Sequence, residues 1–295
     1  MKVYTTILVS VLILQAFIIN AQTEDQQTED RKPTRPHYES SWLIENQSVL
    51  VPKKNTLELM IQHRFGEVSS GSEDLWGIYL PSNIRLGLNY TALDNVGFGK
   101  IRGPVSFGYG TTRDGRIHDF NMKYAMMSQT TDNVVPVSIT YFTNMAIEAE
   151  KSLEELPNQN RSDRYSFFHQ LILSRRVSSA LSVQLAPTLS HYNVVSPYMN
   201  NDHFSIGIGG RLKFSPQSEV LFNMDQPITT HEFYNPQPTV SFGLGVGTSS
   251  HAFQVFMTNA RFLIPQRNSM YNQNDPWQFQ GNWFLGFNIT RKWNY

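Results

Sequence analysis

The sequence predicts a transmembrane antiparallel up-and-down β-barrel of about 12 strands, with short periplasmic turns and long extracellular loops. Three observations favour this fold class. Segments in which apolar and polar residues alternate recur from residue 56 to the last residue, and a period of two is typical of a two-faced strand. The connections between these segments alternate between long and short. The last segment, residues 283–295, carries aromatic residues at both ends of an apolar stripe, as a strand that crosses a bilayer does.

The N-terminal part of the chain predicts export. Residues 1–21 are typical of a signal peptide, with Lys2 before an apolar run over residues 7–19 and a plausible cleavage site at residues 19–21. That run is too short to span a bilayer as a helix, although a retained anchor is the alternative. Residues 22–39 lack apolar periodicity and predict a flexible periplasmic leader. The alternating segments of the barrel begin at residue 56, and the role of residues 40–54 is open at this point.

The alternating segments predict the strands in chain order. Pro136 lacks a backbone donor and weakens the fifth segment, and Phe168 and Ile172 leave the inner face of the sixth unusually apolar. The predicted strands cover residues 56–65, 84–90, 96–98, 120–126, 135–141, 165–173, 181–189, 204–214, 220–224, 240–246, 253–257 and 283–295. The predicted long loops cover residues 66–83, 101–116, 144–164, 191–202, 225–238 and 259–282, and the short turns 91–95, 127–133, 175–179, 215–218 and 248–250.

The same alternation assigns side chains to the two faces of the wall. Charges on the polar inner face either line an aqueous path or pair across a filled interior; pairing is favoured because uncompensated charge in a narrow lumen is costly. These charges are Glu58, Arg85, Lys123, Arg211 and Glu219. The aromatic girdle and closing strand are predicted to include Tyr90, Tyr124, Tyr141, Trp283, Trp293 and Tyr295. Glycines on the inner face of residues 204–214 and 240–247 fit curvature or the close packing of a loop.

The composition argues against several other classes of protein. Lys plus Arg and Asp plus Glu both number 24, so charge offers no reason to expect nucleic acid as a partner. The chain has no cysteine and no closely spaced histidine motif, so we predict no metal or other cofactor. Asn272, Asn274 and Asp275 are interpreted as a plain polar loop rather than a calcium site. A soluble sandwich or lipocalin-like barrel would have to bury too large an apolar face.

Five stretches resemble one family. They are LIENQSVLVPKKNTLELMIQHRFG (residues 43–66), DLWGIYLPSNIRLGLNY (74–90), DQPIT (225–229), YNQNDP (271–276) and GFNIT (286–290). They are similar to the outer-membrane β-barrel proteins of Bacteroidota that form the family called domain of unknown function 5777. The resemblance implies the outer membrane of a Gram-negative bacterium. It also implies that residues 40–54 belong to the barrel, which assigns the barrel domain to residues 40–295. It implies no activity, so no catalytic residue is carried over.

Two functional hypotheses remain open at this stage, and neither is an enzyme. The first is a channel or uptake port for small polar solutes; if residues 259–282 occlude it, diffusion through the resting state is excluded. The second is a non-conducting barrel whose extracellular loops bind or anchor a partner. A hydrolase is a distant third, with histidines near the loops at His118, beside Asp119, and at His191, His203 and His231. The expected partners are outer-membrane lipid and the barrel-assembly machinery, for which Tyr295 is a candidate recognition signal.

Overall fold

The computed structural model of the protein describes residues 32–98, 101–150, 152, 154–158, 160–278 and 282–295. The predicted signal peptide and most of the predicted leader therefore lie outside the described residues. Among the described residues, no helix is long and apolar enough to cross a membrane.

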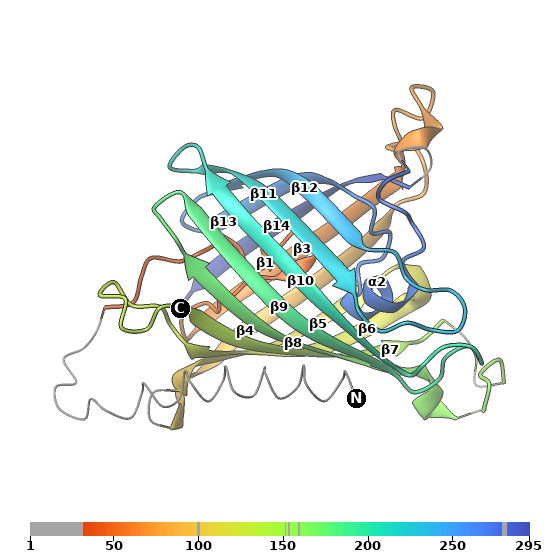
Figure 1. The fold of residues 1–295 in the computed structure, drawn as a ribbon, viewed down its shortest axis with the longest axis horizontal. Helices are drawn as coiled ribbons and strands as arrows, with labels where there is room; N and C mark the ends of the chain where they lie inside the picture. The colour runs from red at the N-terminus through yellow and green to blue at the C-terminus, as the bar shows by residue number, and fades with distance from the viewer. Residues whose placement is uncertain (1–31, 99–100, 151, 153, 159, 279–281) are drawn as a thin grey trace, which may run out of the picture. The chain divides into compact units, whose positions relative to one another are not determined.

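Twelve antiparallel strands of the described chain close into one barrel (Figure 1). Each strand pairs with the next along the chain, and β14 pairs with β3 to close the sheet. The predicted fold class is thereby confirmed. The strands are β3 (Thr56–Glu67), β4 (Asn83–Phe98), β5 (Ile101–Thr112), β6 (Ile117–Met127), β7 (Ser138–Glu148), β8 (Tyr165–Arg176), β9 (Leu181–Tyr192), β10 (Asp202–Lys213), β11 (Ser218–Pro227), β12 (Thr239–Gly247), β13 (His251–Thr258) and β14 (Phe284–Asn294).

The strand assignment from sequence was wrong over residues 91–116 and at the end of β7. Residues 91–95, predicted to be a short turn, lie inside β4, and residues 144–148, predicted to begin a long loop, belong to β7. Residues 101–116 were predicted to be a long loop, but most of them form β5. The short segment 96–98, predicted as a separate strand, is the end of β4. Gly110 of β5 lies on the inner face, where a methyl group would lie 2.5 Å from Asp119 Oδ2, so the wall has no room there for a larger side chain.

Most of the longer connections lie at one end of the barrel, although residues 128–137 form a connection of similar length at the other (Figure 1). Residues 68–82, 149–164, 193–201, 228–238 and 259–283 connect strands at one end, which we call the long-loop rim. The turn at residues 113–116 lies there too and is short. The opposite end, the short-turn rim, holds the remaining turns and the C-terminus. Three 3-10 helices, η1 (Val68–Ser70), η2 (Asp114–Arg116) and η3 (Arg161–Arg164), and the helix α2 (Pro265–Tyr271) belong to the long-loop rim.

The wall has two faces of opposite character. Outward-facing apolar side chains such as Leu88 and Val255 are exposed, as contact with lipid requires. Polar side chains such as Gln62 and Asn288 alternate with them and are buried in the interior. The interior is filled by chain that precedes the first wall strand, where β1 (Trp42–Leu43) and β2 (Asn46–Gln47) form a small antiparallel hairpin.

Candidate functional site

Residues 38–50, which we call the plug, fold into the barrel lumen from the short-turn rim. Just before them, the Thr34 amide donates to the Gln129 carbonyl at 2.8 Å, in the turn between β6 and β7. The plug reverses direction at Ile44, whose φ of 56° is the left-handed conformation of a tight turn. The chain then returns to the start of β3. His37, Tyr38 and Glu39, assigned from sequence to a flexible leader, instead lie against the wall, and Tyr38 is fully buried.

Polar side chains of the wall hold the plug from almost every direction. Asn46 Nδ2 donates to both carboxylate oxygens of Asp225 at 2.8 Å. Other wall side chains donate hydrogen bonds to backbone carbonyl oxygens of the plug. Peptide groups that have no partner within the plug thereby gain one in the interior. These wall groups are Lys123 on Ser41 O, Thr140 on Val49 O, Gln184 on Gln47 O, Gln254 on Trp42 O and Asn288 on Ile44 O, at 2.7–2.9 Å.

An apolar core lies inside the barrel where the plug meets the wall. On the plug side it contains Tyr38, Leu43, Ile44 and Val49. On the wall side, inward-facing side chains from five strands complete it: Phe142, Phe168, Ile172, Ala186, Leu221 and Phe256. The unusually apolar inner face of β8 is thus the surface against which the plug packs.

The two carboxylates of the plug bind cations of the wall. Near the turn, Arg64 donates to Glu45 from Nε at 3.2 Å and from Nη2 at 2.9 Å, a two-point contact. At the base, Glu39 pairs with Arg211 at 3.1 Å and with Lys213. Burial acts to raise the pKa of Glu39, but the hydrogen bond and charge of Lys213, with the charge of Arg211, outweigh it and lower that pKa.

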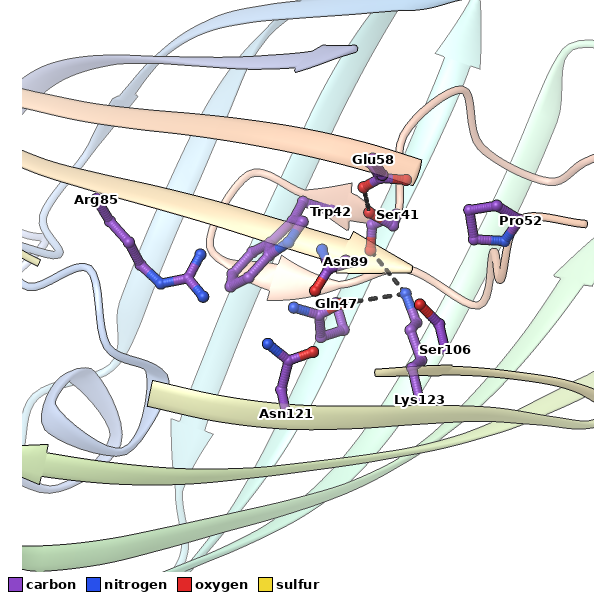
Figure 2. A pocket seen from close by; sticks show the side chains of 10 residues that line it. All are labelled: Ser41, Trp42, Gln47, Pro52, Glu58, Arg85, Asn89, Ser106, Asn121 and Lys123. Carbon is purple, nitrogen blue, oxygen red and sulfur yellow. Dashed lines mark hydrogen bonds between the residues drawn. The ribbon is translucent and has the colours of Figure 1, made fainter. Parts of the chain in front are cut away.

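The predicted lumen charges all lie buried in the interior, where each has a polar partner. Arg85 donates to both oxygens of Asp119, at 2.8 and 2.6 Å, and Arg211 to Glu219 at 3.0 Å. Lys123 and Glu58 contact the plug: Lys123 donates to Ser41 O and Gln47 Oε1, and Glu58 accepts from Ser41 Oγ (Figure 2).

Arg64, Asp119 and Asp225 complete this set of interior charges, although the sequence analysis did not single them out. Arg64 carries the alternation signal that identified the others, since it follows Gln62 at a spacing of two in the first strand. Asp119 was noted only as the neighbour of a loop histidine. Asp225 was placed at the start of a loop, because the ninth predicted strand ended too early.

The lumen holds little free space between the plug and α2. Two cavities of about 10 and 20 Å³ border the plug, and each has room for about one water molecule. On the other side, α2 enters the mouth of the barrel, where Gln266 Nε2 donates to Asn144 Oδ1 at 3.0 Å and Met270 is fully buried. Among the described residues, the plug and α2 thus occupy the lumen at these positions.

Two larger cavities open at the long-loop rim. One, of about 580 Å³, is lined by Arg64, Arg113 and Arg261 together with carboxylates and loop residues. The other, of about 650 Å³, lies beside α2 and includes Tyr271 and Arg267. Burial, followed by the charge of Glu148, raises the pKa of Tyr271 to about 12.

Residues 38–293 match the family model described as membrane bound beta barrel domain, domain of unknown function 5777. The chain belongs to this family. Among solved structures, the NanC porin is similar at 9% identity, with 81% of this chain and 99% of that chain covered and a TM-score of 0.46. The KdgM porin is similar at 10% identity, with 81% of this chain and 99% of that chain covered and a TM-score of 0.45. An outer membrane channel from Pseudomonas putida F1 is similar at 9% identity, with 83% of this chain and 97% of that chain covered and a TM-score of 0.48. No curated protein sequence matches.

The aromatic residues predicted for the girdle of this membrane bound beta barrel fall into two groups. Tyr124 and Tyr141 face each other across β6 and β7, near the short-turn rim, and Tyr90 and Trp293 each lie opposite Leu57 there. Tyr295 is 79% exposed at the same rim. Trp283 differs, because it precedes β14 and is buried at 4% exposure, with its ring 5.5 Å from that of Phe242. Their action as a lipid-interface girdle stays a prediction.

The histidines considered for hydrolysis are dispersed over the barrel. His118 contacts Tyr109 on the outer face, whereas its neighbour Asp119 points inward to Arg85. Successive strand residues face opposite ways, so this dipeptide does not form a catalytic pair. His203 and His231 contact each other at 3.0 Å at the long-loop rim. No group of three or more potential ligands is placed to hold a metal ion in the described part of the chain.

Proposed function

We propose that this protein is an outer-membrane port for small polar solutes that is closed at rest by its own plug. The observation that carries the proposal is that β1 pairs only with β2, while the wall ladder closes from β14 to β3 without them. The plug can therefore leave the lumen without breaking any backbone pairing of the wall. The outer membrane of a Gram-negative bacterium is the proposed location, because bacterial single-chain barrels with this layout of turns and loops reside there.

The nature of the contacts supports a movable plug. Most of its polar contacts are hydrogen bonds to wall side chains, which water can replace when the lumen fills. The wall surface beneath them carries amides, hydroxyls and charges, such as Gln184, Thr140 and Lys123. A solute path lined by these groups is hydrated and polar.

A second candidate is a non-conducting barrel that binds a partner through its long loops. The apolar core between plug and wall favours it, because Leu43 and Ile44 are fully buried and their withdrawal would expose both surfaces to water. The two candidates differ in one measurable property. Only the port requires the plug to leave the lumen during function.

A reversible tether tests the port directly. Ser40 Oγ lies 2.8 Å from Thr290 Oγ1 on β14, so sulfur atoms at the two γ positions lie within reach of a disulfide. The chain has no cysteine, so S40C and T290C are the only thiols of the double variant and can form a disulfide within the chain only with each other. In single-channel recordings of the full chain, we expect openings for wild type, none for the oxidised pair, and their return on reduction.

Matched single variants guard the interpretation. S40C alone and T290C alone should open like wild type under both redox conditions, because neither can form the tether. If wild type and the reduced pair stay silent at every voltage, the port is refuted and the second candidate stands. If the oxidised pair conducts as wild type does, the plug is not the closure.

A further inference from the structure

The ion pairs of the lumen are of two kinds, which differ in whether the carboxylate lies on a wall strand or in the plug. In Arg85–Asp119 and Arg211–Glu219 both partners belong to the wall. In the pairs Arg64–Glu45 and Lys213–Glu39, the cation lies on the wall and the carboxylate lies in the plug. Residues 38–50 contain these two carboxylates and no lysine or arginine.

Withdrawal of the plug therefore removes negative charge and leaves its cationic partners behind. Arg64 and Lys213 lose their carboxylates, and Lys123 loses two oxygen acceptors. Two wall carboxylates also lose plug donors: Glu58 loses Ser41, and Asp225 loses Asn46. Lys123 and Lys292 continue to act on Glu58 by their charge. The balance of the opened wall is positive.

Arg64 is the cation best placed to meet a solute. It lines the cavity of about 580 Å³ at the long-loop rim, a volume suited to a small organic molecule. Arg113 and Arg261 line the same cavity, as do Glu67, Asp114 and Glu150. The carboxylate of Asp114 lies 3.8 Å from Arg267, and Glu67 accepts from Ser69.

We propose that Arg64 is a carboxylate-binding site of the port, occupied at rest by Glu45 of the plug and taken over by the carboxylate of an anionic solute. This inference rests on the proposed port. The Arg64 side chain is 1% exposed while Glu45 is bound to it, and it loses this carboxylate when the plug leaves. A solute carboxylate that binds the freed guanidinium through two hydrogen bonds stabilises the state in which Glu45 has left. A solute that binds only the open state shifts the equilibrium towards it. Anionic solutes thus release the plug and then pass through a wall that prefers them.

The test compares a dicarboxylate with its neutral amide in single-channel recordings of the full chain. Glutarate and glutaramide match in length and differ in charge. We expect millimolar glutarate to raise the open probability at least about threefold and glutaramide to leave it unchanged, because only the carboxylate competes for a guanidinium. In a salt gradient, the reversal potential should show anion permeability above cation permeability.

The variant Glu45→Gln keeps the shape of the side chain and removes its charge. It should open more often without glutarate and respond less to it, whereas Glu73→Gln, the same change on an exposed loop residue, should behave as wild type. A port that opens but prefers cations, or that responds equally to both probes, overturns the Arg64 site and leaves the port intact. Silence of wild type, of Glu45→Gln and of the reduced cysteine pair overturns the port, and this inference with it.

Discussion

Gly209 provides a direct way to weaken the docked plug from the wall side. It lies on the inner face of β10, and a methyl group built there would be 2.5 Å from Leu43 Cδ2, well inside van der Waals contact. Leu43 is fully buried in the apolar core, so it has little room to retreat. We therefore expect Gly209→Ala to destabilise docking of the plug while the wall strand itself stays paired.

The expected magnitude follows from the cost of overpacking. Forcing one extra methyl group into a filled interior typically costs about 1–3 kcal/mol. Because 1.4 kcal/mol corresponds to a factor of ten, the population of the undocked plug should rise by roughly 5- to 150-fold.

Thiol labelling measures that population. The chain has no cysteine, so S48C introduces its only thiol. Ser48 is fully buried in the plug, so this thiol reacts with a maleimide only when the plug undocks. In the S48C background, Gly209→Ala should accelerate labelling by the factor above. Gly210→Ala is the matched control, because Gly210 lies on the same strand, and the nearest neighbours of an added methyl group are Ser182 and Val183 of β9 rather than the plug.

Two outcomes would refute the reasoning. Equal labelling rates for Gly209→Ala and Gly210→Ala would show that the contact with Leu43 does not hold the plug. A rate for S48C alone that equals that of a thiol placed at the exposed residue Ser178 would show that the plug is not docked in the membrane protein.

Two further predictions concern interior charges. Asp119→Asn leaves the buried Arg85 without its two-point partner and should destabilise the barrel by about 3–5 kcal/mol, seen as a lower temperature for loss of the folded band in heat-modifiability gels; replacing both residues by leucine should cost less, and an equal loss would contradict the ion-pair explanation. Burial, with the charges of Arg211 and Arg176, lowers the pKa of His37, which directly precedes the plug, from 6.5 to about 4. Docking of His37 and the plug is therefore unimpaired above pH 6.5 and weakens as the pH falls towards 4, because the undocked state takes up the proton first. The open probability should rise over that range, and His37→Gln, which cannot be protonated, should show a flatter pH profile.

Alternation was enough to predict most of the wall, because the signal lies within each strand separately. In β8, β9 and β10 the period of two survives in the side chains, and the predicted strands overlap the observed ones closely. In β5, Phe107 and Tyr109 alternate with Gly108 and Gly110, yet the strand was taken for a loop, although β12 was predicted from the same pattern. The missing side chain is a tertiary fact: Gly110 leaves space for the Arg85–Asp119 pair, which joins residues distant in the chain.

The closure of the lumen could be recognised only from the tertiary structure. Residues 40–54 are too short and irregular to show periodicity. Their hydrogen-bond partners on the wall are single side chains from eight strands. The apolar inner face at Phe168 and Ile172 was visible in the sequence, yet its counterpart, Leu43, is adjacent only in the folded molecule.

The sequence by itself determined the barrel, its two faces and the interior position of Glu58, Arg85, Lys123, Arg211 and Glu219, because a strand's period specifies which side chains turn inward. Only the tertiary structure decided what those inward groups meet. A polar lumen can hold either water or a folded segment. The plug occupies it because its peptide groups, its two carboxylates and its apolar side chains all have complementary partners on the wall.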